Sequence, residues 1–193
     1  MSQYRFCNER LLKDLQVDGE GTCVTFRTPS EVTAVHFDEQ RIEKVVHEDL
    51  HTGRVSQLGP EAAHHIVVGS GNWERDVYHF LKPSESPHLQ LRLGLTVHRG
   101  EGTWSSLPHH FETCPEQGFE EVFFYLLRGG TERAIQVGRG LWADGSPVDA
   151  VWPVAHRAFG VVPMGYHPVV GEPGVKVSYI WGYVAKKKSW EKI

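Results

Sequence analysis

Apolar and polar residues alternate along most of the chain, as in VTAVHF from Val32 to Phe37 and RDVYHFL from Arg75 to Leu81. Successive side chains of a β-strand point to opposite faces of its sheet, so this period of two predicts strands that bury one face. Glycine and proline separate the segments, which favours an all-β sandwich or barrel. The expected strands cover residues 22–27, 32–37, 41–47, 63–68, 75–81, 89–98, 121–127, 133–141, 154–162 and 175–185.

One short helix is expected near the start of the chain. Asn8 is a residue type that caps helices, and Leu11, Leu12 and Leu15 follow it before Gly19. The rest of the sequence shows almost no helical period, so this helix would be an exception in a chain of strands.

Candidate chemistry is concentrated in the stretch WSSLPHHFETCPEQGFEEVFFY, from Trp104 to Tyr125. His110 and Glu112 are two residues apart, which places both on one face if this segment is extended. Glu121 opens a run of strand-forming residues, and a return of the chain through Gly118 would bring it beside His110. Imidazole and carboxylate groups from neighbouring strands can bind a divalent transition metal. The alternative is a solvated loop with ordinary surface residues.

A second stretch, VVPMGYHPVV from Val161 to Val170, strengthens the metal hypothesis. Proline and glycine on both sides of His167 predict a strand that is entered from a tight turn, which would give this histidine a fixed direction. His64 and His65 form a rival pair, but adjacent strand residues point to opposite faces. We therefore interpret those two as surface or partner-contact residues.

Several segments resemble the family of cupin sugar-acid isomerases that includes 5-deoxy-glucuronate isomerase and 4-deoxy-5-ketouronate isomerase. They occur in the family's order between about Gly69 and Ala185. The matching segments are Gly69-Ser70-Gly71-Asn72-Trp73 with Arg75 and Val77, Gly102-Thr103-Trp104-Ser105-Ser106 with Pro108, Glu121 to Tyr125, Asp144 with Ser146 and Asp149, and Pro163-Met164-Gly165-Tyr166-His167-Pro168.

This resemblance implies a single cupin-like β-barrel of the jelly-roll, or double-stranded β-helix, type, with extra N-terminal strands. Residues 1–68 would be an N-terminal β extension of the barrel, residues 69–185 the cupin domain, and residues 186–193 a basic tail. Family members resemble two fused cupin halves, whereas this chain resembles the metal-bearing half with an abbreviated first part.

The family's metal is held by a His-x-His pair, a glutamate and a last histidine. His110, Glu121 and His167 match three of these positions, and the second histidine of the pair falls on Glu112. A register shifted by one residue would put His109 and Phe111 in the pair, and phenylalanine cannot bind a metal. We therefore predict one divalent metal, either zinc, manganese, iron or nickel, on His110, Glu112, Glu121 and His167.

The resemblance also implies an enzyme, namely a metal-dependent isomerase that moves a proton between neighbouring carbons of a sugar acid or related carbohydrate. Glu112 is the candidate catalytic base, with a plain ligand role as the alternative. Tyr125 shares the parity of Glu121, so it should line the same interior, either as a substrate-binding residue or as core. Alternative functions are a non-catalytic sugar-binding cupin, or another metal-dependent cupin enzyme such as an oxygenase or epimerase.

A sugar acid also needs a cation for its carboxylate. Arg92, Arg133 and Arg139 lie on expected strands, and the last two share a parity. The sequence leaves open which of these arginines points inward.

Composition narrows the possible partners. The formal net charge is -4, from 20 basic and 24 acidic residues, which gives no footprint for nucleic acid. The odd, widely spaced cysteines Cys7, Cys23 and Cys114 favour a reducing cytoplasm. We find no signal-peptide core and no membrane-spanning run. Because cupin sheets leave exposed edges, we expect a homodimer that acts on a small carbohydrate.

Overall fold

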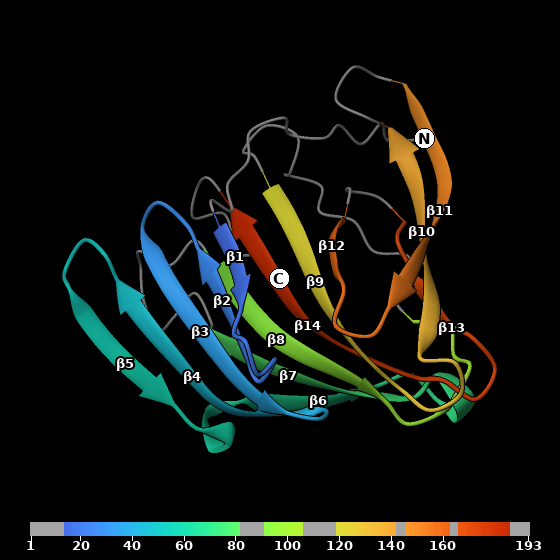
Figure 1. Ribbon diagram of the computed structural model, residues 1–193, viewed down its shortest axis with the longest axis horizontal. Helices are drawn as coiled ribbons and strands as arrows, with labels where there is room; N and C mark the ends of the chain where they lie inside the picture. Colours follow the sequence, from blue (N-terminus) through green and yellow to red (C-terminus); the bar gives the residue numbers. More distant parts are fainter. Residues whose placement is uncertain (1–13, 82–90, 106–118, 142–145, 163–165, 186–193) are drawn as a thin grey trace.

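The computed structural model describes residues 14–81, 91–105, 119–141, 146–162 and 166–185, and almost all of its regular structure is β-strand (Figure 1). The described helices are the short 3-10 turns η1 (Pro60–Ala62) and η2 (Gly71–Trp73). Neither is long and apolar enough to cross a membrane. The expected all-β class is therefore confirmed.

The first five strands form an antiparallel sheet in chain order. It contains β1 (Asp14–Val17), β2 (Cys23–Arg27), β3 (Glu31–Asp38), β4 (Arg41–Asp49) and β5 (Arg54–Leu58). From Glu31 to Phe37, β3 alternates between buried and partly buried residues, as the sequence period requires, and Asp38 at its end is exposed. This sheet therefore has one face available to pack on the rest of the molecule.

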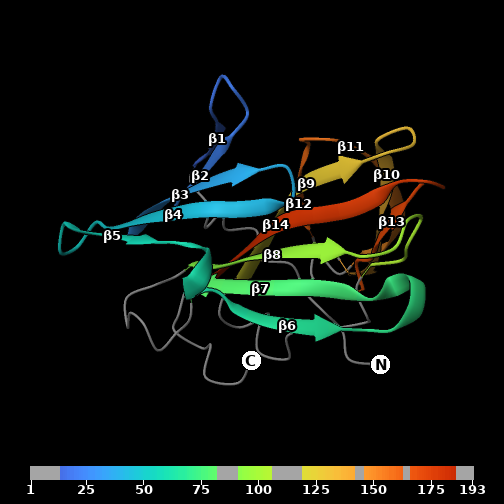
Figure 2. The same ribbon diagram turned by 90° about the horizontal axis from the view of Figure 1, so that it is seen from below.

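A six-stranded sheet lies beneath the five-stranded one, with the strand order β12-β9-β14-β8-β7-β6 (Figure 2). Its strands are β6 (His64–Val68), β7 (Arg75–Leu81), β8 (Leu91–His98), β9 (Phe119–Arg128), β12 (Phe159–Val162) and β14 (Lys176–Ala185). Strand β14 pairs with β8 on one side and with β9 on the other, antiparallel in both cases. Strands β8, β14 and β9 are thus neighbours inside this sheet.

A three-stranded sheet, in the order β11-β10-β13, faces the other side of the six-stranded sheet. It contains β10 (Arg133–Leu141), β11 (Pro147–Ala155) and β13 (Val169–Gly171). We call the side of the six-stranded sheet that faces these strands its inner face, and the side that faces β1–β5 its outer face.

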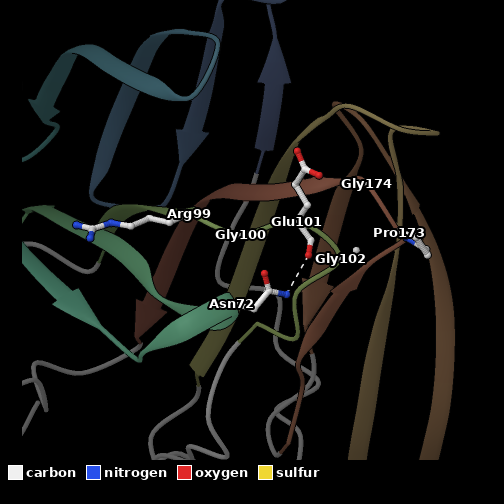
Figure 3. Close-up of a pocket in the computed structure, with 8 residues that line it drawn as sticks. Asn72, Arg99, Gly100, Glu101, Gly102, Pro173 and Gly174 are labelled. Atoms are coloured by element: carbon white, nitrogen blue, oxygen red, sulfur yellow. Dashed lines mark hydrogen bonds between the residues drawn. The ribbon is translucent and has the colours of Figure 1, made fainter.

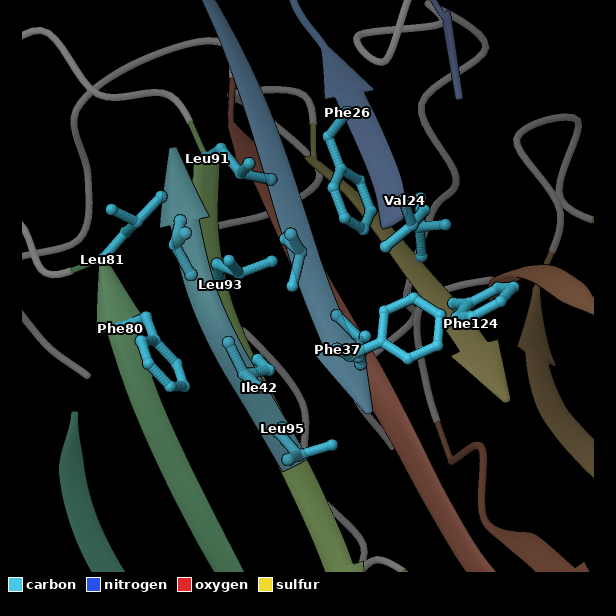
Figure 4. Close-up of a cluster of buried hydrophobic side chains, with 14 of the residues drawn as sticks. Val24, Phe26, Phe37, Ile42, Phe80, Leu81, Leu91, Leu93, Leu95 and Phe124 are labelled. Carbon is cyan, nitrogen blue, oxygen red and sulfur yellow. The ribbon is translucent and has the colours of Figure 1, made fainter. Parts of the chain in front are cut away.

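The outer face carries a mainly hydrophobic core (Figure 4). In β9 this core takes Val122, Phe124 and Leu126, which are all almost completely buried. From the five-stranded sheet and the other strands it takes Val24, Phe26, Val35, Phe37, Ile42, Val45, Phe80, Leu81, Leu91, Leu93, Leu95, Ile180 and Val184. Burial of each large side chain contributes about 1.5–3 kcal/mol, so this core stabilises the attachment of β1–β5.

The inner face packs a second core made of the residues between those positions. Strand β9 contributes Phe123, Tyr125 and Leu127. The other members are Ala134, Val154, Val169, Val175, Val177, Tyr179 and Trp181. This core is richer in aromatic and hydroxyl-bearing side chains than the outer one, and the polar residues discussed below lie on the same face.

Three local expectations differ from the structure. Leu15 lies in strand β1 opposite Phe26, so the helix through Leu15 is wrong there, and residues 1–13 lie outside the described part of the chain. A few apolar residues at helical spacing are too weak a signal to resist pairing with a sheet. The segment 154–162 is two elements, because the chain turns between β11 and β12 with Arg157 at φ 61°.

Strands β5 and β13 were not expected, and the N-terminal strands divide between two sheets. Strands β1–β5 pair among themselves, while β6 extends the six-stranded sheet by pairing with β7. The division of the chain into residues 1–68, 69–185 and 186–193 stays a prediction, and the tail from residue 186 lies outside the described residues.

Candidate functional site

Two of the expected metal ligands meet on the inner face. Glu121 lies near the start of β9, and His167 lies just before β13, on a segment tied to β10 by the bond from the Val137 amide to the Pro168 carbonyl. Nε2 of His167 is 3.0 Å from Oε2 of Glu121. The two residues are only 4% and 1% exposed, so the pair is shielded from bulk water.

The carboxylate of Glu121 is a suitable place for a cation. Its buried oxygens lie near Nε2 of His167 and the hydroxyl of Tyr183, but within the described residues neither accepts a hydrogen bond of standard geometry. A buried charge without such compensation is costly, and a metal ion would remove that cost. Imidazole and carboxylate ligands suit zinc and other divalent transition metals, so the donor chemistry fits the expected ion.

This pair supplies two ligands, which is fewer than a metal site needs. The described part of the chain holds no group of three or more histidine, cysteine, aspartate or glutamate side chains able to hold a metal. His110 and Glu112, at which the remaining ligands and the catalytic base were predicted, lie outside the described residues, as does His109 of the alternative register. Their roles therefore stay predictions.

The segment before those residues is anchored next to His167. The Ser105 amide donates to the Val169 carbonyl at 2.7 Å, and its hydroxyl is 2.8 Å from the hydroxyl of Tyr179. The indole nitrogen of Trp104 donates to the Tyr166 hydroxyl at 3.0 Å, and the two rings stack. The Trp-Ser motif and the Tyr-His-Pro motif are thus joined side by side.

Gln136 on β10 fixes the backbone at His167, and the sequence analysis missed it. Its side-chain nitrogen donates to the carbonyls of His167 at 2.6 Å and Pro168 at 3.1 Å. Its side-chain oxygen accepts a hydrogen bond from the Tyr125 hydroxyl at 2.8 Å. Gln136 is buried, so it holds the histidine segment by contacts that water does not weaken.

Tyr125 points to the inner face, as its parity predicted. The residue is 1% exposed, and burial, with smaller contributions from Tyr179 and Glu121, raises the pKa of its phenol far above the ordinary value. It is therefore a neutral hydrogen-bond donor, committed to Gln136. Its oxygen still has lone pairs that can accept, so the substrate-binding role stays a prediction.

A row of polar side chains crosses the neighbouring strands β8, β14 and β9, and Glu121 of the pair belongs to it. Tyr183 on β14 lies opposite Glu121 on β9 and opposite Arg92 on β8, so the three side chains share the inner face. Burial, and then the charge of Glu121, raises the pKa of Tyr183 well above its ordinary value. Trp181 and Phe123 face one another in the next row of the same face, so aromatic rings lie beside the polar row.

The arginines that sequence left open are now placed. Arg92 is 8% exposed and lies on the inner face, whereas Arg133 is exposed. The Arg139 side chain is 66% exposed and pairs with Asp149, so the last residue of the segment with Asp144 and Ser146 makes a surface ion pair. His64 and His65 are exposed as expected, and His65 pairs with Asp76 at 2.8 Å.

A surface pocket at the other end of the sheet contains Asn72 of the Gly69–Trp73 motif (Figure 3). It is lined by Asn72, Arg99, the turn Gly100–Gly102, Gly171 and the turn Pro173–Gly174. The Asn72 side chain donates to the Glu101 carbonyl at 3.1 Å, which fixes that turn. The pocket lies near the far end of β9 from Glu121, so we assign the Gly-x-Gly-Asn motif a structural role.

Comparisons with known proteins agree with these motifs. The model of the KduI/IolB family matches residues 20–193. The 5-deoxy-glucuronate isomerase of Geobacillus kaustophilus (strain HTA426) is 30% identical over 140 residues, which cover 70% of this chain and 47% of the relative. That of Bacillus subtilis (strain 168) is 31% identical over 111 residues, 55% of this chain and 40% of the relative.

A solved structure shares the fold. The crystal structure of an IolB-like protein from Salmonella typhimurium LT2 superposes with a TM-score of 0.61 at 23% sequence identity, covering 84% of this chain and 65% of that chain. The chain spans about half the length of the curated relatives it matches.

Proposed function

The chain belongs to the KduI/IolB family, and from this premise we propose that it is a metal-dependent isomerase of a sugar acid, of the aldose–ketose type. The observation that carries the proposal is the buried contact of Glu121 with His167, two family ligand positions that meet 3.0 Å apart. Because similar proteins are named 5-deoxy-glucuronate isomerase, 5-deoxy-glucuronate is the first substrate to assay.

We place the metal on His110, Glu112, Glu121 and His167. Ser105 is bonded to Val169, two residues beyond His167. His110 follows Ser105 by five residues, a span of at most about 18 Å. His110 can therefore reach the buried pair from an anchored starting point. A glutamate at the family's second histidine position keeps a suitable donor and makes the ligand set harder.

The residues of the chain then divide the work of isomerisation. When bound, a divalent ion supplies an electrophile that polarises a carbonyl and its neighbouring hydroxyl. Glu112 acts as the base that takes the proton from one carbon and returns it to the next. The phenol oxygen of Tyr125 accepts a hydrogen bond from a sugar hydroxyl while its own O–H continues to donate to the side-chain oxygen of Gln136. The buried position of Glu121 and His167 keeps bulk water from the reacting atoms.

The test compares ligand variants with a neighbouring control. His167→Ala and His110→Ala should each lose the metal, lose isomerase activity and melt at a lower temperature, because binding to the folded state adds to its stability. His109→Ala should keep its metal. Elemental analysis, an isomerisation assay and melting with and without a chelator provide the measurements. Metal loss in His109→Ala with retention in His110→Ala would show that the register is wrong by one residue.

A non-catalytic sugar-binding protein is the second candidate, favoured because Glu112 stands where the family has its second histidine ligand. That function predicts sugar binding without isomerisation by metal-loaded protein. Oxygen consumption, in turn, would identify an oxygenase rather than an isomerase. A wild type that purifies without metal and melts identically with chelator would move the sugar-binding function ahead.

We also propose that the protein forms a homodimer and resides in the cytoplasm. The edge strands β5 and β6 present exposed apolar residues, with Val55 at 60% and Val67 at 49% exposure. Uncovered strand edges favour association with a second chain. Cys23 carries a free thiol, which suits a reducing compartment. A monomer in sedimentation at micromolar concentration would contradict the dimer.

A further inference from the structure

We propose that Arg92 binds the carboxylate of the substrate, and that this contact gives the site its preference for sugar acids over neutral sugars. The inference rests on the proposed function for the class of substrate. It adds the residue that recognises the acid group, a part of the site that the metal ligands do not supply.

Cross-strand register places Arg92 beside the candidate metal ligands. Arg92 on β8 pairs with Tyr183 on β14, and Tyr183 pairs with Glu121 on β9. Directly paired residues of a sheet project to the same face. Two strand spacings separate the Cα atoms of Arg92 and Glu121, which amounts to about 10 Å. The guanidinium of Arg92 and the candidate metal ligand Glu121 therefore belong to one row of side chains, with the phenol of Tyr183 between them.

This distance suits a substrate held at both ends. A uronic acid carries its carboxylate at the opposite end of the carbon chain from its carbonyl. With the carbonyl end at Glu121 and His167, the acid end extends along the row toward Arg92. The planar guanidinium fork matches the two oxygens of a carboxylate better than a lysine ammonium does.

The backbone that carries Arg92 is held firmly. The amide of Leu91 donates to Oε1 of Glu31 at 2.5 Å, and both residues are buried. Leu91 also packs in the outer core. The strand that presents Arg92 is thus fixed from the opposite face, which suits a residue that must orient a ligand.

Aromatic side chains lie next to the row on the same face of the sheet. Gly94, two residues after Arg92, lies opposite Trp181, and a Cβ there would come within 2.0 Å of the indole. The missing side chain lets Trp181 lie against β8. The centroids of the Trp181 and Tyr183 rings are 5.0 Å apart. Aromatic rings suit the apolar faces of carbohydrates, while Arg92 binds the charged end.

The other described arginines do not share this place. Arg75 is buried, but on β7 it lies opposite His98, at the other end of β8 from Arg92. Arg133 and Arg139 lie on β10 and are exposed. Within the part of the chain that the structure describes, Arg92 is therefore the arginine in the row of Glu121.

The experiment compares a uronate with its neutral counterpart on metal-loaded protein. Calorimetry measures the dissociation constants of D-glucuronate and D-glucose for wild type, Arg92→Gln, Arg92→Lys and the control Arg133→Gln. Wild type and the control should prefer glucuronate. Arg92→Gln should weaken glucuronate binding about tenfold to hundredfold, the range for a charged hydrogen-bonded contact. Glucose binding should not change in any of the three arginine variants.

The outcomes separate the two proposals. If Arg92→Gln keeps the wild-type preference for glucuronate, the role of Arg92 is wrong and the proposed isomerase stands. If wild-type protein binds both sugars equally, the substrate class fails and the role of Arg92 fails with it. Arg92→Lys keeps the charge, so it decides the matter if Arg92→Gln does not fold. Its affinity for glucuronate should fall several-fold, and an unchanged affinity would contradict the need for a guanidinium fork.

Discussion

The two faces of the six-stranded sheet are built from alternate residues of the same strands, yet they differ in kind. On β9 the outward residues Val122, Phe124 and Leu126 are all apolar, and they meet other apolar side chains from β1–β5. The inward residues begin with Glu121 and include Tyr125, and they meet His167 and Gln136. The outer face is built for cohesion, and the inner face combines packing with polar contacts.

The comparison shows how a small fold can keep a buried charge. Polar groups on the inner face cost free energy when they are removed from water. The outer face buries mainly apolar area on the same strands, although it also buries Ser178 and, from the facing sheet, Glu31, Thr33 and His47. It therefore holds those strands in register while the inner face carries the candidate site. Stability and function are thus separated by a single step along the strand.

Neighbouring substitutions on β9 would break this comparison most directly. Phe124→Ala should lower the free energy of unfolding by about 3–5 kcal/mol, because it leaves a cavity in the outer core. The folded fraction should still bind one metal. Glu121→Gln should do the opposite, losing the metal while the metal-free protein stays within about 1 kcal/mol of wild type. Denaturant unfolding and elemental analysis measure both effects, and equal destabilisation by the two changes would contradict the separation.

The two ends of the inner face can be compared through pH. His98, at the opposite end from Glu121, is fully buried, and its Nδ1 donates to the Val177 carbonyl at 2.9 Å. Burial, opposed by that hydrogen bond and supplemented by the charge of Arg75, lowers the pKa of His98 to about 4 from its ordinary 6.5. Between these values the unfolded chain binds more protons than the native protein, so stability is lost as the pH falls from 6.5 toward 4.

This loss should amount to about 3 kcal/mol across that pH window. His98→Gln removes the titrating group, so the difference between wild type and variant should shrink as the pH falls. Burial also lowers the pKa of His47 on β4, which adds a loss in the same direction to both proteins and cancels in the comparison. A wild-type curve parallel to that of His98→Gln between pH 6.5 and 4 would show that His98 is not the titrating group.

The smallest expected effect concerns the support of His167. Gln136→Leu removes the donor that holds the His167 and Pro168 carbonyls and should lower metal affinity about tenfold to hundredfold. Tyr125→Phe removes only the hydrogen bond to Gln136, worth about 0.5–1.5 kcal/mol, and should affect metal affinity less. Competition with a chelator measures both. Unchanged affinity in Gln136→Leu would mean that packing alone positions the histidine.

Much of the fold was predictable because alternation is a direct consequence of strand geometry. The bounds of β7 and β10 agree with the expected residues 75–81 and 133–141. Strand β13 has only three residues, which is too short for a periodic signal, and it exists because it pairs with β10. The early helix failed for a related reason, since pairing with β2 decided the conformation of Leu15.

The site was predictable where a motif fixed the residue and unpredictable where only the fold did. Glu121 and His167 were named from sequence words and do meet. Gln136 was missed because burial in this part of β10 is the reverse of what residue polarity predicts. The apolar Ile135 is 37% exposed, whereas the polar Gln136 faces inward and is 4% exposed. When a polar and an apolar residue follow one another in a strand, the polar one is ordinarily assigned to the surface. The inward direction of Arg92 was equally open, because strand arginines are usually outward.

Strand β14 comes last in chain order among the described strands, yet it occupies the middle of the six-stranded sheet, between β8 and β9. During synthesis on the ribosome, the edges of β8 and β9 therefore wait for a strand that has not yet emerged. Arg92 and Glu121 become neighbours only through Tyr183 of that strand. Such late, long-range pairing slows folding and leaves open edges exposed to other chains. The candidate site should therefore be among the last parts of a newly made molecule to assemble.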